Sequence, residues 1–321
     1  MSEGSRPVRV GVVGVGHLGA LHVAKYAAAP RTHVVALFDT DPARARPIAE
    51  RYGCAVAESL DQLLASVDAV SIAVPAVAHA DVGCRAARAG VHMLIEKPLA
   101  ADSIAARRLV EAARTAGVVV QVGHLERFNP VFEDLRAMVD HPRFVECHRL
   151  YPFAGRGVDT NVVFDVMIHD LDIIAYLVGE PVARVEAVGV PILSREVDIA
   201  NARIRFRGCC IANVTASRVS LKRERKLRVF QRDAYVSVDF EARNATIARR
   251  VHEHGGDDPM AGIEVETRSF AEADPLRAEI ESFLECVRTG AAPVVSGADG
   301  LDALAIADLV VGALEVPDET R

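Results

Sequence analysis

The chain has no long apolar run, and this absence excludes a helical membrane span. Half of its 321 residues are hydrophobic, but every apolar stretch is short, whereas a spanning helix needs about 20 consecutive apolar residues. The first nine residues, MSEGSRPVR, also lack the apolar core of a secretion signal. We therefore expect a cytoplasmic protein with no membrane partner.

Paired cysteines are absent as well. The six cysteines form no CxxC pair and show no metal-ligand spacing with histidine, so a disulfide scaffold and a zinc site are both disfavoured. We expect free thiols in a reducing compartment and no metal ion.

The sequence also lacks an excess of positive charge. Its formal net charge is −7, which argues against a nucleic-acid partner. Lysine is scarce, with only four among the 37 basic residues. Because arginine serves at most basic positions, a lysine inside a motif is of particular interest.

What is present begins with a glycine-rich loop. A β-branched run from Val8 to Val15 predicts a strand buried on both faces. It leads into Gly14-x-Gly16-x-x-Gly19 and a helix-favouring segment from Ala20. Gly14 permits a tight turn, Gly16 lets a pyrophosphate approach the backbone, and Gly19 lets the helix pack on the strand. The free N–H groups at the helix start attract the phosphate.

An acidic residue completes this motif. A second β-run, residues 34–38, ends at Asp39, about 20 residues after Gly19, where a carboxylate accepts hydrogen bonds from the adenosine ribose of NAD. The motif predicts a dinucleotide site for NAD, with His17 and Leu18 in the phosphate-binding turn. A glycine-rich turn in another kind of α/β protein is the alternative.

Strand and helix signals alternate as far as residue 123. This alternation predicts an α/β fold, a doubly wound parallel Rossmann sheet over residues 1–123. Ligands bind beyond the carboxyl ends of such strands. The residues that fall there, and that we assign to cofactor binding together with the glycine-rich turn, are Asp39, Val74, Pro75, Glu96, Lys97 and Gln121.

The pattern changes over residues 124–321. Several segments there alternate apolar and polar residues, which predicts an α+β domain with a large, mostly antiparallel, open-faced sheet. We expect this domain to bind substrate and to form a homodimer or homotetramer through the open face. The C-terminal helix is expected to pack back on the first domain.

A lysine motif, Glu96-Lys97-Pro98, follows a predicted core strand. The proline constrains the backbone and directs Lys97 toward a cleft, although the sequence does not decide whether the Lys97–Pro98 bond is cis. A surface lysine in an ordinary strand-to-helix turn is an equally good interpretation of position alone.

A second cluster is Asp165-x-x-x-His169-x-x-Asp172. On a helix these residues share one face, and a histidine held between carboxylates suits a general base near neutral pH. A solvated charged face and half of a metal site are the alternatives, but no further ligands stand out.

A third cluster lies at the predicted domain junction. Gln121 is a candidate for hydrogen-bonding the nicotinamide carboxamide or a substrate hydroxyl, and Arg127 for contacting a phosphate or carboxylate. His79, in VPAVAH, is a further candidate or an ordinary first-turn helix residue.

Taken together, the sequence resembles the Gfo/Idh/MocA oxidoreductase family over essentially its whole length. The resemblance is carried by the glycine motif, Val74-Pro75-x-x-x-His79, Glu96-Lys97-Pro98 and Asp165-x-x-x-His169-x-x-Asp172, in the family's order and spacing. It implies NAD(P)-dependent oxidation or reduction of a secondary alcohol, usually on a sugar or cyclitol. It also implies that Lys97, Asp165 and His169 are catalytic and that His79 lies at the cofactor.

Two segments, GHLERFNP and DVMIHDLDI, are further similar to those of bacterial UDP-N-acetylglucosamine 3-dehydrogenases. This implies oxidation at C3 of a nucleotide sugar, for an aminotransferase that makes the 2,3-diamino sugar of lipid A. The substrate residues would be Lys97, Asp165, His169, Asp172, Arg127 and Arg156. Dehydrogenation of a UDP-sugar acid or a free polyol such as inositol stays open, as do an NAD-dependent glycoside hydrolase and a non-catalytic nucleotide sensor.

Overall fold

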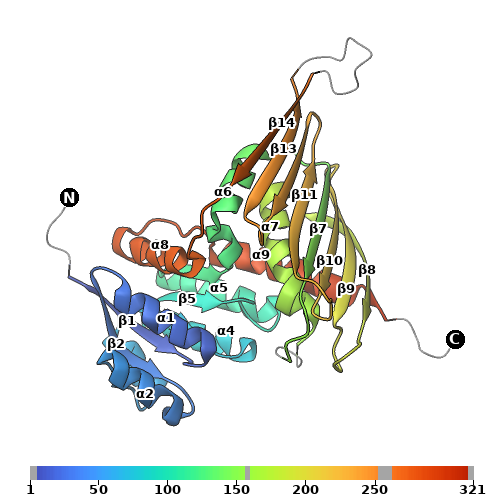
Figure 1. Cartoon of the computed structure of the whole chain (residues 1–321). Coiled ribbons are helices and arrows are strands. Elements are labelled where there is room, and N and C mark those ends of the chain that lie inside the picture. The colour runs from blue at the N-terminus through green and yellow to red at the C-terminus, as the bar shows by residue number, and fades with distance from the viewer. Residues whose placement is uncertain (1–5, 156–159, 252–261, 317–321) are drawn as a thin grey trace. The chain divides into compact units, whose positions relative to one another are not determined.

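The computed structural model describes residues 6–155, 160–251 and 262–316 and divides into two compact units (Figure 1). The first unit is Met1–Phe128 with Asp274–Leu304, and the second is Asn129–Ala273 with Ala305–Arg321. The predicted boundary after residue 123 therefore lies inside the first unit. Asp274–Leu304, which the sequence analysis assigned to the second domain, belongs to the first unit.

The first unit is built on a six-stranded parallel sheet in the order β3-β2-β1-β4-β5-β6. This confirms the predicted doubly wound architecture. Its strands are β1 (Val8–Val13), β2 (Thr32–Phe38), β3 (Ala55–Val56), β4 (Ala69–Ile72), β5 (His92–Glu96) and β6 (Val120–Gly123). Its helices are α1 (His17–Ala28), α2 (Pro42–Tyr52), α3 (Leu60–Ser66), α4 (Ala76–Arg88), α5 (Ser103–Ala116), the 3₁₀-helix Leu125–Phe128 and α8 (Pro275–Thr289), and α9 (Gly297–Gly312) crosses the division between the units.

Local sequence explains where these helices begin. Asp41, Ser59, Asp102 and Asp274 each accept a hydrogen bond from a backbone N–H of the first turn, as favoured capping residues do. The 3₁₀-helix was not predicted.

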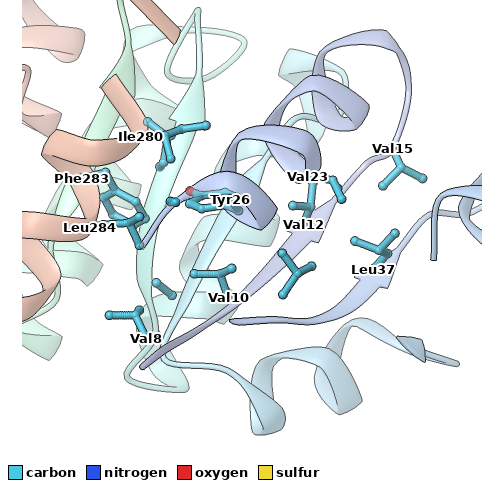
Figure 2. Packing of buried hydrophobic residues seen from close by; sticks show 14 of the residues in the cluster. Val8, Val10, Val12, Val15, Val23, Tyr26, Leu37, Ile280, Phe283 and Leu284 are labelled. Carbon is cyan, nitrogen blue, oxygen red and sulfur yellow. The ribbon is translucent and has the colours of Figure 1, made fainter. Parts of the chain in front are cut away.

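The core of the first unit lies where α1 and α8 pack on the sheet. Figure 2 shows Tyr26 of α1 among Ile280, Phe283 and Leu284 of α8, above Val8 and Val10 of β1. The first-unit sheet thus receives a helix from far along the chain, and the same cluster includes Leu94 of β5.

The second unit contains a nine-stranded sheet in the order β14-β13-β12-β11-β7-β10-β9-β8-β15. Its strands are β7 (Phe144–Leu150), β8 (Val182–Val190), β9 (Ile199–Phe206), β10 (Ile211–Ser217), β11 (Glu224–Phe230), β12 (Ala234–Asp239), β13 (Asn244–Arg250), β14 (Ile263–Ser269) and β15 (Leu314–Glu315). Its helical segments are α6 (Pro130–Met138), the π-helix Val163–Met167 and α7 (Ile168–Val178). Only the β7–β10 and β8–β15 pairs are parallel, so the predicted mostly antiparallel sheet is confirmed.

Alternation along the strands gives the sheet one buried and one more exposed face. In β7 and β9, every second side chain is buried while its neighbours are at least partly exposed. The chain leaves α9 after Gly312, and Leu314–Glu315 then pairs with β8.

Three observations bear on the expected absences. Within residues 6–155, 160–251 and 262–316, no helix is long and apolar enough to cross a membrane. The same residues contain no group of three or more metal-ligating side chains suited to an ion. All six cysteines are free thiols.

Candidate functional site

The glycine-rich loop has the backbone geometry of a phosphate-binding turn. Gly14 has a φ of +82°, and a Cβ there would lie 2.6 Å from the carbonyl oxygen of Ala73. A Cβ on Gly19 would lie 1.9 Å from the carbonyl oxygen of Gly14, so helix α1 approaches the strand as closely as predicted. A Cβ on Gly16, by contrast, would meet nothing within 4 Å. Gly16 therefore leaves the space that a pyrophosphate needs.

Helix α1 begins at His17 with no side chain capping it. Gly16, His17 and Leu18 are all exposed, so the N–H groups of the first turn are available to an anion. Together with the open side of Gly16, this start fits the diphosphate of NAD.

Asp39 lies beside the same loop. Its Oδ2 accepts a hydrogen bond from the N–H of Val15 at 2.9 Å, and its Oδ1 accepts one from the N–H of Asp41 at 2.9 Å. These bonds fix the carboxylate at the end of β2, and each oxygen retains further acceptor capacity. The contact predicted between Asp39 and the ribose stays a prediction.

His79 joins two strand-end turns. One ring nitrogen lies 2.8 Å from the carbonyl oxygen of Val74 and the other 2.8 Å from that of Pro98, and the Lys97–Pro98 bond is cis. Burial lowers the pKa of His79, although both carbonyl contacts oppose that shift. His79 thus fastens the turn after β4 to the turn that carries Lys97.

Lys97 is half-buried, whereas the side chain of Glu96 turns into the protein and is only 6 % exposed. Glu96 Oε1 lies 2.9 Å from Nε2 of His22, and Oε2 accepts a hydrogen bond from the N–H of Lys97 at 3.3 Å. The structure therefore gives Glu96 buried partners from the protein itself. Its predicted contact with the cofactor stays a prediction.

Gln121 and Arg127 are also buried. The amide of Gln121 is fully enclosed and donates a hydrogen bond to the carbonyl oxygen of Glu279 at 2.8 Å. Arg127 is 3 % exposed, with a guanidinium nitrogen 3.8 Å from Asp299. This geometry gives both residues partners from the protein itself, and their predicted contacts with nicotinamide and phosphate stay predictions.

The second unit brings the Asp165–His169 cluster together on one continuous helical segment. Asp165 lies in the π-helix and His169 in the first turn of α7. Both are half-buried, while Asp172 is 1 % exposed. The π-helix was not predicted, and such turns occur often at functional sites.

A buried ion pair that was not predicted links this helical segment to strand β7. Arg149 of β7 contacts Asp170 through two nitrogens at 2.6–3.0 Å, and both side chains are about 1 % exposed. Bidentate contacts of this kind fix orientation. Asp170, the residue next to His169, is thereby fixed to the sheet. An arginine at an inward position of an alternating strand was the available signal.

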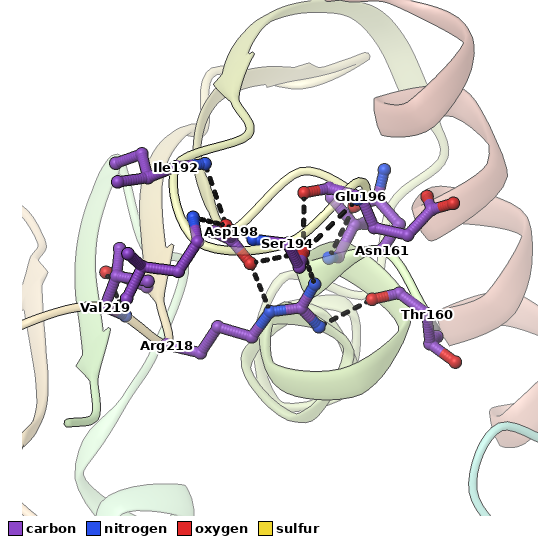
Figure 3. A network of polar contacts seen from close by, with 11 residues as sticks. Thr160, Asn161, Ile192, Ser194, Glu196, Asp198, Arg218 and Val219 are labelled. Carbon is purple, nitrogen blue, oxygen red and sulfur yellow. Dashed lines mark hydrogen bonds and ion pairs between the residues drawn. The ribbon is translucent and has the colours of Figure 1, made fainter. Parts of the chain in front are cut away.

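A second missed pair holds the residues that lead into the π-helix (Figure 3). Arg218 donates to Asp198 Oδ1 at 2.8 Å and to the carbonyl oxygen of Thr160 at 2.6 Å. Asp198 Oδ2 accepts three backbone hydrogen bonds from the loop at Ile192 to Ser194. Because the charge is compensated on all sides, the pKa of Asp198 is held well below its usual range by Arg218 and these donors, despite burial. Arg156, predicted to contact a diphosphate, lies outside the described residues.

Comparisons with known proteins agree with this geometry. Residues 8–124 match the model of an oxidoreductase family with an NAD-binding Rossmann fold, and residues 135–237 match the Gfo/Idh/MocA C-terminal domain. The chain is 39% identical to a UDP-N-acetylglucosamine 3-dehydrogenase of Acidithiobacillus ferrooxidans, over 96% of this chain and 97% of that protein. A solved structure of the enzyme of that name from the same organism superposes with a TM-score of 0.90 at 38% identity, covering 97% of this chain and 98% of the other.

A more distant relative has another substrate. An inositol 2-dehydrogenase of Rhizobium meliloti is 28% identical over 95% of this chain and 96% of its own length. The matches thus span nearly the full length of both relatives.

Proposed function

Because this chain belongs to the Gfo/Idh/MocA family of NAD-dependent oxidoreductases, we propose that it oxidises UDP-N-acetylglucosamine at C3 to the 3-keto sugar. The chain is an NAD-dependent sugar dehydrogenase acting on a CH–OH group. The proposal concerns which sugar it takes, and the physiological role would be supply of a 3-keto sugar to an aminotransferase in lipid A 2,3-diamino-sugar synthesis.

The main support for this substrate is the similarity to the Acidithiobacillus ferrooxidans enzyme at 39% identity over 96% of the chain. The similarity to the inositol dehydrogenase is lower, at 28%. The segments GHLERFNP and DVMIHDLDI, which carry the resemblance in the sequence, form the 3₁₀-helix with the start of α6, and the π-helix with the start of α7.

The residues have separate roles in the proposed reaction. NAD, when bound, supplies the hydride acceptor. His169 takes the proton of the C3 hydroxyl, Lys97 donates a hydrogen bond to the oxygen as negative charge develops on it, and Asp165 orients the reacting side chains. The Arg149–Asp170 pair and the Arg218–Asp198 pair hold the segment that carries Asp165 and His169.

The test couples the protein to a 3-keto-sugar aminotransferase with glutamate, because oxidation of a secondary alcohol by NAD is unfavourable near neutral pH. Mass spectrometry then looks for the amino sugar. We expect product from UDP-N-acetylglucosamine and none with the Lys97→Met variant. Product from the corresponding UDP-sugar acid, with none from UDP-N-acetylglucosamine, would contradict the substrate assignment. So would formation of NADH with myo-inositol in a parallel assay while UDP-N-acetylglucosamine gives nothing.

The exposed face of the nine-stranded sheet supports a homo-oligomer. Phe144, Phe230 and Tyr235 lie on neighbouring strands with ring centroids 5.0–5.6 Å apart, and Phe230 is 36% exposed. We propose that a second copy of the chain covers this aromatic cluster. Sedimentation velocity of the wild type should give a dimer or tetramer, and Phe230→Glu should shift it toward the monomer. A monomeric wild type at micromolar concentration would contradict the proposal.

A further inference from the structure

A cluster of polar side chains, several of them titratable, lies buried in the first unit beside the turn that carries Lys97. Its members come from five elements and are at most 6% exposed. They are His22 and Tyr26 of α1, Ser71 of β4, Glu96 of β5, Gln121 of β6 and Glu279 of α8. The mechanism above uses none of these side chains.

Four of these residues form a chain of hydrogen bonds that ends at Glu96. The hydroxyl of Tyr26 lies 2.8 Å from Ser71 Oγ, Ser71 Oγ lies 2.9 Å from Nδ1 of His22, and Nε2 of His22 lies 2.9 Å from Glu96 Oε1. A carboxylate only accepts, so Nε2 carries the proton. Burial raises the pKa of Tyr26, so the phenol keeps its proton. We assign Tyr26 as donor to Ser71, Ser71 as donor to His22, and His22 as donor to Glu96.

The two buried carboxyl groups differ in charge. Burial alone would raise the pKa of Glu96, but the hydrogen bond from His22, the charge of Lys97 and the Lys97 N–H outweigh it and leave the pKa below its usual value. Burial, reinforced by the charge of Glu96, raises the pKa of Glu279 well above its usual value. Neither carboxyl oxygen of Glu279 has a hydrogen-bond partner among the described residues. The interior therefore favours the ionised form of Glu96 and the protonated form of Glu279, as interacting buried acids tend to divide.

The backbone reserves space for the Glu96 carboxylate. A Cβ on Gly123 of β6 would lie 3.0 Å from Glu96 Oε2 and 3.2 Å from Glu96 Cα. The same Oε2 accepts the N–H of Lys97. The charged and titratable groups around Glu96 are thus His22 and Tyr26 from α1, His79 from α4, Glu279 from α8, and Lys97 in the turn itself.

We propose that Glu96 is a positioning residue for Lys97: its buried carboxylate, fixed by the hydrogen bonds that run from Tyr26 through Ser71 and His22, accepts the N–H of Lys97 and orients the turn that carries the lysine. A charged ammonium is the form that stabilises developing negative charge on the substrate oxygen. The inference rests on the catalytic role proposed for Lys97.

The first experiment compares two isosteric variants of the same cluster, Glu96→Gln and Glu279→Gln. We expect Glu96→Gln to lower kcat tenfold or more, with the NAD dissociation constant within twofold of wild type. Glu96→Asp, which keeps the charge, should recover part of kcat, and Glu279→Gln should leave kcat and the pH profile unchanged.

Two further variants each remove one hydroxyl from the hydrogen-bonded series Tyr26–Ser71–His22–Glu96, so that their effects on kcat can be ranked by distance from Glu96. Ser71→Ala removes the hydroxyl next to His22, and Tyr26→Phe removes the one at the far end. We expect kcat to fall more for Ser71→Ala than for Tyr26→Phe, and less for both than for Glu96→Gln. If these variants lower only the melting temperature while the folded protein keeps its kcat and pH profile, the residues are structural and the proposal is overturned.

A second measurement needs no substrate and so separates this inference from the choice of sugar. Each lysine is labelled by reductive methylation at pH 8, where only the unprotonated amine reacts, and labelling is read by mass spectrometry at Lys97 and, for reference, at Lys222. Glu96→Gln should speed labelling of Lys97 at least threefold and leave Lys222 unchanged, whereas Glu279→Gln should alter neither. Equal labelling of Lys97 in wild type and Glu96→Gln overturns the proposal even if UDP-N-acetylglucosamine is the substrate. If that sugar fails as substrate, faster labelling of Lys97 in Glu96→Gln still supports the positioning role of Glu96.

Discussion

Replacement of Glu279 by glutamine should make the protein more stable, and increasingly so as the pH rises. The carboxyl of Glu279 is fully buried on α8 without a hydrogen-bond partner among the described residues, and burial raises its pKa well above the usual value. Between the unfolded pKa and the folded pKa, the folded state holds a proton that the unfolded state has released. The free energy of unfolding therefore falls as the pH rises through this window.

The size of the effect follows from the pH interval. Each pH unit above an unfolded pKa of about 4.3 costs about 1.4 kcal/mol, so a carboxyl still protonated at pH 7 costs up to about 4 kcal/mol. Glutamine has the same shape and no charge to lose, so Glu279→Gln removes the cost. We expect a small difference in melting temperature near pH 5 and a gain of several degrees near pH 7.5.

Scanning calorimetry or dye-monitored melting at half-unit pH steps measures this difference. Glu285→Gln, on the exposed side of the same helix, is the matched control and should show no such trend. A difference between Glu279→Gln and wild type that stays flat from pH 5 to 8 would refute the reasoning. It would mean that Glu279 is ionised in the folded protein, and the division of charge with Glu96 would then be wrong.

Three further predictions concern the two units. Asp39 should make NAD bind at least about tenfold more tightly than NADP, since a 2′-phosphate beside this carboxylate meets like charge; equal dissociation constants by fluorescence titration would contradict this. Lys97→Met and His169→Ala should each lose most of kcat while NAD affinity survives, and near-normal turnover in either variant would place the chemistry elsewhere. Arg149→Met should destabilise the protein by about 3–5 kcal/mol because it leaves Asp170 buried and unpaired, and the double variant with Asp170→Leu should recover most of that loss in urea unfolding.

Much of the fold was predictable because its signals are local. The glycine-rich turn and the apolar alternation of strands each occupy a few consecutive residues. Gly14, Gly16 and Gly19 have the geometry that their spacing predicted. The parallel sheet and the mostly antiparallel sheet followed from such patterns without knowledge of any long-range pairing.

The buried polar partners were not predictable, since they depend on contacts between distant residues. His22 lies 49 residues from Ser71 and 74 from Glu96 along the chain, and a single sequence does not reveal such pairs. A signal existed nonetheless: Glu279 occupies an apolar position of α8 beside Ile280 and Phe283. A charged residue on the buried phase of a helix or strand indicates a satisfied or functional interior group.

The candidate site was predictable as to residue type and less so as to partners. The helix carrying Asp165 and His169 was expected, but the π-helix was not. Its hydrogen bonds join residues five apart instead of four, and nothing in the residue pattern of this segment indicates that change. Gln121 and Arg127 were assigned to ligands from their places at a strand end and at the domain junction, and those contacts stay predictions. The structure adds that both side chains are buried.

The most direct test of the proposed reaction follows the hydrogen on C3. UDP-N-acetylglucosamine deuterated at C3 is incubated with NAD and the protein at high enzyme concentration, with the aminotransferase and glutamate present to remove the ketone. The account predicts that deuterium appears at C4 of the reduced nicotinamide, as mass spectrometry of the recovered NADH would show. Deuterium retained on the sugar, while deuterium from C2-labelled myo-inositol reaches the nicotinamide, would contradict it.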